Sequence, residues 1–240
     1  MSICLEYKKL KRTGFLPAFF GGGLLSAFVP IGNMMFRSEI FVNSPEPALK
    51  ILFNANWQMM AMLNLFLIVI GACIMYHTEY ADNAMQKMDA LPIRQSSNFF
   101  SKFFILTVSI IAVLAIEAAS LAFCIHHWFS LYDEFAIELL KSIGYAAILA
   151  VPTLILMTGI ASICKNMWIS LGVGIICMFV ATMIPKTNFI LSLFPFALPF
   201  QTLWDTESTR IFQFICGVGI ETGVFGMAEL IYLKVRRKFQ

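Results

Sequence analysis

Three glutamates stand inside long apolar stretches of this chain and are the side chains best placed to do chemistry there. Glu117 and Glu221 lie near the middle of their stretches, whereas Glu229 is close to Lys234 and could reach a membrane surface. A carboxyl in such surroundings can relay protons, line a polar path or bond neighbouring helices together. No Lys or Arg lies at a matching depth to pair with the two central acids. Because an unpaired charge is costly there, we expect both to be neutral and to act mainly in helix packing.

Other residue types that often carry chemistry do not form a reactive group here. The sequence contains no GxxxxGK[ST] phosphate-binding loop, and neither GxSxG nor HExxH occurs. His126 and His127 are adjacent, so their side chains diverge on a helix, and we expect them to anchor near a membrane surface. The six cysteines are scattered without a CxxC pair, which argues against a disulfide framework or metal cluster. We therefore expect no catalytic residue, no metal and no cofactor on this chain.

The elements that must position the glutamates are six apolar stretches. A transmembrane helix needs about 20 mostly apolar residues, and each stretch reaches that length. The chain is 59% hydrophobic and only 13% charged, and it has no polar segment long enough for a soluble domain. We expect an all-α membrane protein with a single transmembrane domain over residues 1–240. Its six spans are predicted at residues 14–36, 56–77, 102–126, 142–163, 166–185 and 211–233.

A seventh apolar run, residues 187–204, contains Pro195 and Pro199, which disfavour a continuous helix. Six crossings place both termini on one side, together with 12 of the 17 Lys and Arg residues. A seventh crossing would put the basic C-terminus outside, against the positive-inside bias. We therefore predict cytoplasmic termini and a broken re-entrant hairpin at the outer face. The net charge of +3 reflects this topology and does not indicate nucleic-acid binding.

Two polar segments are predicted to form short helices at the inner surface. In residues 1–12, Ile3, Tyr7 and Leu10 recur on one face, which is typical of a helix lying in the headgroup plane. A basic flank that only fixes topology is the alternative. In the loop after the second span, Ala81, Met85 and Met88 share one helical face, and Pro92 should end the helix near Leu91. This helix could lie on the bilayer or dock into a groove on a cytoplasmic partner.

Small residues recur at intervals of four in two of the predicted spans. Ala18, Gly22 and Ser26 have this spacing in the first span, and Gly219 and Gly223 have it in the last. The pattern allows two membrane helices to approach closely. This spacing is consistent with packing between helices of one chain and also with an interface between two subunits.

The layout resembles that of the type 2 permeases of bacterial ABC exporters. The segments that carry the resemblance are LEYKKLKRTG at residues 5–14, HTEYADNAMQKMDALPIRQSSNFFSK at 77–102 and NFILSLFPFALPF at 188–200. They correspond to a basic interfacial helix, an amphipathic inner helix after span two, and a broken outer hairpin between spans five and six. The length, without an appended domain, is most similar to the small permeases of lantibiotic (bacteriocin) immunity and resistance.

The resemblance implies a half-transporter of the bacterial cytoplasmic membrane. Such a permease pairs with a second permease, identical or homologous, and with ABC ATPase subunits that bind ATP and Mg. Residues 1–12 would form a gate-side interfacial helix, and residues 189–201 would cap the pathway at the outer face. The implied cargo is an amphipathic cationic peptide. The residues implied to couple the chain to its ATPase are Glu79, Asp82, Met85, Met88 and Asp89.

Two other classes of protein stay open at this point. A six-span substrate-binding module of a vitamin uptake system would also lack an ATPase motif, but it should have a polar ligand cluster near the outer face. A membrane-embedded enzyme would need convergent His, Asp or Glu residues on facing helices, whereas this sequence has only two central acids.

Overall fold

The structure is a computed structural model that describes residues 3–80, 95–129, 132–184, 188–204, 206 and 208–239. These ranges contain helices and connecting segments but no strand, as the all-α prediction requires. In chain order the elements are α1 (Ile3–Leu10), α2 (Phe15–Val42), α3 (Ala48–Tyr80), α5 (Gln95–Trp128), α6 (Phe135–Ile163), α7 (Met167–Met183), α8 (Phe189–Ser192), the 3-10 turn η2 (Leu198–Phe200) and α9 (Ser208–Phe239).

Five of these helices, α2, α3, α5, α6 and α9, are long and apolar enough to cross a membrane. The remaining predicted span, residues 166–185, corresponds to α7, which has 17 residues and is shorter than the others. At 1.5 Å per residue it measures about 25 Å, slightly less than a typical hydrocarbon core. The first span was expected to end at Phe36, yet α2 continues to Val42 after a kink at Arg37, whose φ of −139° is not helical.

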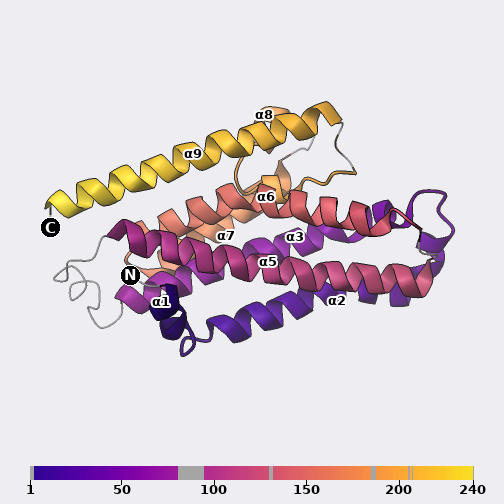
Figure 1. Ribbon diagram of the computed structural model, residues 1–240, viewed down its shortest axis with the longest axis horizontal. Coiled ribbons are helices and arrows are strands. Elements are labelled where there is room, and N and C mark those ends of the chain that lie inside the picture. The colour runs from indigo at the N-terminus through magenta and orange to yellow at the C-terminus, as the bar shows by residue number, and fades with distance from the viewer. Residues whose placement is uncertain are drawn as a thin grey trace.

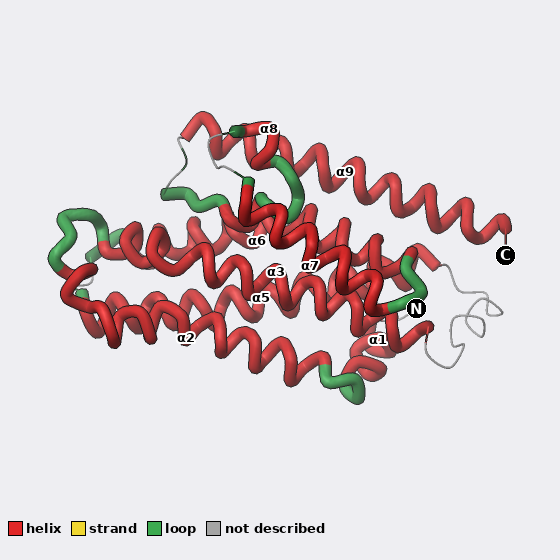
Figure 2. The backbone as a smooth tube through the Cα atoms, turned by 180° about the vertical axis from the view of Figure 1, so that it is seen from behind, coloured by secondary structure: helices red, strands yellow, loops and turns green. Residues whose placement is uncertain are grey.

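The long helices lie side by side as an elongated bundle, with α3 in its interior (Figure 1). In the most apolar part of α3 and of α6, 67% of the residues are buried, compared with 17% in α9. The helix α9 packs mainly on α6 and lies at the edge of the bundle, as the view from behind also shows (Figure 2). The C-terminal end of α9 and helix α1 lie toward the same end of the molecule (Figures 1 and 2). We call this the α1 end.

Residues 188–204 do not form a membrane-spanning helix. They contain the one-turn helix α8 and the turn η2, and the stretch from Pro195 to Thr202 is buried against the bundle. Two of their backbone carbonyls accept hydrogen bonds from other helices. The Trp57 indole on α3 donates to the Pro199 oxygen at 3.0 Å, and the Thr153 hydroxyl on α6 donates to the Pro195 oxygen. Irregular backbone within a bundle needs such partners because no water is available to replace them.

The two sets of small residues have different surroundings. A Cβ added at Gly22 would lie 2.5 Å from a methyl carbon of Leu67 on α3, so α2 and α3 approach closely at this point. Ser26 is buried and Ala18 is half-buried on the same helix. Gly22 and Ser26 thus contact other helices of the same chain. By contrast, a Cβ added at Gly219 or Gly223 on α9 would meet no described atom within 4 Å.

Candidate functional site

Four charged side chains form a buried cluster at the α1 end of the bundle. Lys102, near the start of α5, lies between two acids: its Nζ is 2.9 Å from Glu6 Oε2 on α1 and 2.9 Å from Glu79 Oε1 in the last turn of α3. Lys9 adds a second cation, 2.7 Å from Glu6 Oε1 and 3.6 Å from Glu79 Oε1. Lys102, Glu6 and Glu79 are each only 1% exposed. Two cations and two anions thus balance each other, and only Lys9 is partly exposed.

Further groups complete the polar contacts of this cluster. The Asn98 amide donates to both carboxylate oxygens of Glu79, at 2.9 and 3.0 Å. Lys102 donates to the Met75 carbonyl at 3.1 Å and lies 5.2 Å from the centre of the Tyr76 ring, a cation–π contact. Every charge therefore has both an ionic partner and a hydrogen-bond partner, which a buried ion pair needs in order to be tolerated.

The charges of the cluster lower the pKa of Glu6. Burial alone raises it, but the ammonium groups of Lys102 and Lys9 outweigh that effect, so the carboxyl stays ionised. A carboxyl whose pKa is lower in the folded state contributes stability above its unfolded pKa, and that contribution is lost as the pH falls through the folded pKa. The link between α1 and the bundle is therefore intact at neutral pH and weakens in acid.

The cluster joins α1 to the two helix ends that flank residues 81–94. Glu79, implied to contact an ATPase, has its carboxylate directed to α1 and α5 inside the bundle. The other implied coupling residues, Asp82, Met85, Met88 and Asp89, lie outside the described residues. Sequence reasoning missed Glu6 and Lys102. The available signals were one acid within a basic helix and one lysine at the edge of an apolar run.

A second polar cluster lies within the bundle and joins three helices. Glu117 on α5 is fully buried; it accepts hydrogen bonds from the Ser26 hydroxyl on α2 and, at 3.1 Å, from the Asn64 amide on α3. No Lys or Arg in the described ranges pairs with it. Glu117 thus holds α2, α3 and α5 together, as a packing role requires. Toward the end opposite α1, Asn33 donates to Asn56 at 2.9 Å and links α2 to α3 again.

The other two intramembrane acids do not join this cluster. Glu221 lies half-buried on α9, and its Oε2 has no hydrogen-bond partner among the described residues. Glu229 was expected to reach the inner surface beside Lys234, but it is buried and accepts a hydrogen bond of 2.6 Å from Ser162 on α6. Gly159, one turn before Ser162, makes room for its carboxylate, because a Cβ there would lie 3.0 Å from Glu229 Oε2.

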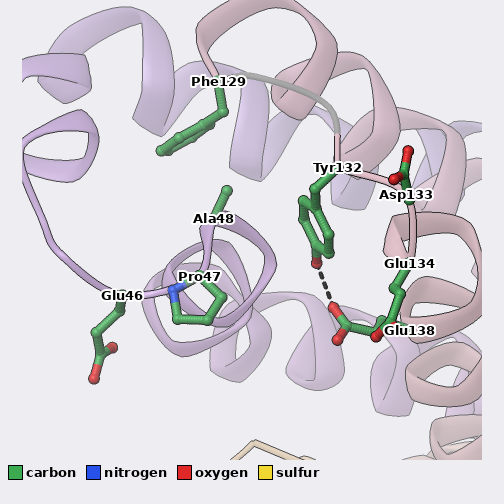
Figure 3. A pocket seen from close by; sticks show the side chains of 8 residues that line it. All are labelled: Glu46, Pro47, Ala48, Phe129, Tyr132, Asp133, Glu134 and Glu138. Atoms are coloured by element: carbon green, nitrogen blue, oxygen red, sulfur yellow. Dashed lines mark hydrogen bonds between the residues drawn. The ribbon is translucent and has the colours of Figure 1, made fainter.

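At the end opposite α1, a pocket of about 600 Å³ opens between the α2–α3 connection and the start of α6 (Figure 3). Its lining combines two aromatic rings with four carboxylates: Glu46, Pro47, Ala48, Phe129, Tyr132, Asp133, Glu134 and Glu138. Of the four acids, Glu46 is neutralised by Lys50 at 2.6 Å. The others have no cationic partner in the part of the chain that the structure describes.

Tyr132 and Glu138 fix one wall of this pocket. The Tyr132 hydroxyl donates to the Glu138 carboxylate (Figure 3). Burial raises the pKa of Tyr132, and the hydrogen bond to Glu138 with the charges of Glu138 and Glu134 raises it further, so the phenol stays protonated. The pocket therefore has negative charge beside apolar ring faces, a combination suited to an amphipathic cation. Its acids come from two separate segments, Glu46 and residues 133–138, and sequence reasoning did not find them.

Comparison with known families places these features in context. Residues 2–181 match the model of a family described as ABC-2 family transporter protein. The chain belongs to the ABC-2 transporter family. The match covers helices α1 to α7, and with them both polar clusters and the pocket. No curated protein and no solved structure matches the chain.

Membership in this family identifies the chain as a membrane permease of an ABC exporter. ABC-2 permeases associate with ABC ATPase subunits and are normally not catalytic themselves. The apolar helices and the family together indicate a multi-pass membrane protein. In this permease, the charged cluster lies where the helices on both sides of residues 81–94 meet α1.

Replacing Lys102 by Ala should strongly destabilise the permease. The change leaves Glu6 and Glu79 buried with the partly exposed Lys9 as their one remaining cation among the described residues, and removing one partner of a buried pair costs about 3–5 kcal/mol. For a chain of this size we expect the unfolding temperature of the purified protein to fall by on the order of 10 °C. Lys50→Ala is the control, because its pair with Glu46 is largely exposed and worth about 0–1 kcal/mol. Equal melting temperatures for the two variants would contradict the conclusion that Lys102 holds a buried charged cluster together.

Replacing Glu117 by Gln should leave assembly and transport nearly intact. Glutamine keeps one acceptor oxygen for the Asn64 amide, and its NH2 group can donate to the Ser26 hydroxyl oxygen. By contrast, Glu117→Leu leaves both groups buried without a partner, at about 1–3 kcal/mol each. Glu221→Gln, at a position without such bonds, should be milder than Glu117→Leu. Thermal unfolding and transport are measured side by side. A Glu117→Gln variant that assembles but does not transport would instead indicate a charge or proton role.

Proposed function

We propose that this permease is the membrane subunit of an ATP-driven exporter that expels an amphipathic cationic antimicrobial peptide. The peptide would be of the lantibiotic or bacteriocin kind, and the process self-immunity or resistance. The supporting observation for this cargo is the pocket with aromatic rings and uncompensated carboxylates at the end opposite α1. A cationic side chain gains from nearby carboxylates and from ring faces, and an apolar residue gains from the rings.

The proposed assembly contains two permeases, identical or homologous, and two ATPase subunits that bind ATP and Mg. The free face of α9, including Gly219 and Gly223, supports a helix contact with the second permease, because small residues let helices approach closely. The complex lies in the bacterial cytoplasmic membrane with both termini of the permease in the cytoplasm. In this orientation the acidic pocket faces outward, and residues 189–201 cover the pathway beside it.

ATP hydrolysis would act on the permease through residues 79–91. Movement of this segment pulls on the ends of α3 and α5, which the Glu6–Lys102–Glu79 contacts join to α1. Because the contacts are short and the groups fully buried, α1 follows the two helix ends instead of sliding over them. The interfacial helix and the coupling segment thereby move as one unit.

Neutralising the acidic pocket should weaken protection against a cationic lantibiotic. The triple variant Asp133→Asn, Glu134→Gln and Glu138→Gln removes up to three charges, and one charge at contact distance in water is worth about 1 kcal/mol, or fivefold. We expect the inhibitory concentration of the peptide to fall severalfold in cells carrying the triple variant. Glu39→Gln, an exposed acid on α2 outside the pocket, should have no effect. Full protection by the triple variant would exclude the pocket from cargo recognition.

Replacing Met85 and Met88 together by Asp should uncouple ATP hydrolysis from export. Two charges on the apolar face predicted for the coupling segment would prevent it from entering a groove on the ATPase. We expect the ATPase to be lost on copurification or to hydrolyse ATP without protecting cells, while the amount of inserted permease is unchanged. If the double variant copurifies with its ATPase and still protects cells, the segment is better regarded as a membrane-surface helix.

A further inference from the structure

An apolar groove of about 350 Å³ lies between α1 and α5, away from the charged cluster. Its walls are Ile3 and Tyr7 of α1 and Phe104, Ile105, Val108 and Ser109 of α5. Most of these side chains are about half exposed along the groove. The groove is therefore a furrow on the lipid-facing surface and is separate from the interior of the bundle.

The groove begins where the apolar part of α5 begins. Lys102 marks the last charge before the span, and Phe104 to Ser109 form the next turns of the helix. At 1.5 Å per residue, Ser109 lies roughly 10 Å beyond Lys102 along the helix. The groove thus covers the depth at which the upper part of a lipid acyl chain packs beneath its headgroup.

Positive charge lies on α1 and in the turn after it, close in the chain to the groove residue Tyr7. Lys8, Lys11 and Arg12 are exposed and form no ion pair within the described part of the chain, whereas Lys9 is engaged by Glu6 and Glu79. The backbone N–H of Lys11 bonds to the Tyr7 carbonyl at 3.2 Å, so Lys11 lies one helical turn after the groove residue Tyr7. A ligand that fills the groove would therefore have its polar end close to cations without partners.

We propose that this groove is a binding site for an anionic phospholipid of the inner leaflet. One acyl chain lies between Tyr7 and Val108, and the phosphate contacts Lys8, Lys11 and Arg12. Charge complementarity favours an anionic headgroup over a zwitterionic one, since each basic residue near an anionic lipid contributes about 1 kcal/mol. The lipid would stabilise the side of α1 that carries Ile3 and Tyr7, whereas the Glu6–Lys102 ion pair stabilises another side. The choice of the inner leaflet rests on the proposed cytoplasmic termini, whereas the site itself does not depend on the cargo or on the ATPase.

The test measures how much lipid the purified full-length chain retains, by native mass spectrometry after detergent extraction. The protein is first incubated with phosphatidylglycerol or with phosphatidylcholine. Val108→Trp fills the groove, and Val180→Trp on α7 is the matched control, because both valines are 48% exposed on helices of the bundle surface. The variant Lys8→Gln, Lys11→Gln, Arg12→Gln removes the charges without touching the packed core.

We expect the unaltered chain to retain phosphatidylglycerol at least tenfold more than phosphatidylcholine. Val108→Trp should lose this lipid while Val180→Trp keeps it. The triple charge variant should bind both lipids equally, since each lost cation weakens binding about fivefold. Equal retention of the two lipids by the unaltered chain would overturn the proposal, and so would a triple variant that keeps the preference. Retention by Val108→Trp at the level of Val180→Trp would also overturn it. If Val108→Trp does not fold, the triple variant decides, because its three side chains are exposed.

Discussion

A buried ammonium group must be surrounded by opposite charge, and this requirement at Lys102 determines how one end of the bundle is built. A single charge moved into a medium of low dielectric constant costs many kcal/mol unless it is paired and hydrogen-bonded. Here the pairing groups come from α1 and α3, and the cation comes from α5. The three helices therefore have few alternative arrangements. A rotation of any of them about its axis would leave a charge without its partner.

The same physical rule operates elsewhere in the bundle through hydrogen bonds without an ion pair. Glu117, Ser26 and Asn64 join α2, α3 and α5, while Trp57 and Thr153 bond to the carbonyls of the irregular segment between α7 and α9. Apolar side chains pack almost equally well against lipid and against each other, so polar bonds of this kind add to van der Waals packing in holding helices together in a membrane. The helix α3 takes part in two of these four bonds, which agrees with its position in the interior.

The sequence predicted the helices better than the contacts between them. Long apolar runs predicted the positions of α2, α3, α5, α6, α7 and α9, since length and hydropathy are local properties. Glu229 was expected to reach the membrane surface and is instead buried against Ser162, which lies 67 residues away in the sequence and comes near only through the packing of α6 on α9. The charged cluster and the acidic pocket were missed for the same reason. The partners of each charge depend on how each helix is rotated about its axis in the bundle, and this rotation cannot be read from a single sequence.

The contact between Glu6 and Lys102 also sets an order of events during synthesis of the chain. The two residues are separated by 96 positions, which a ribosome crosses in ~5–20 s. During that interval Glu6 has only its neighbour Lys9 as a basic partner within the cluster. The cluster can close only after α3 and α5 have inserted with Glu79 and Lys102 on the same side of the membrane as α1. A nascent chain in which α5 entered the wrong way round would leave these acids without Lys102, and such chains would be the natural targets of membrane quality-control proteases.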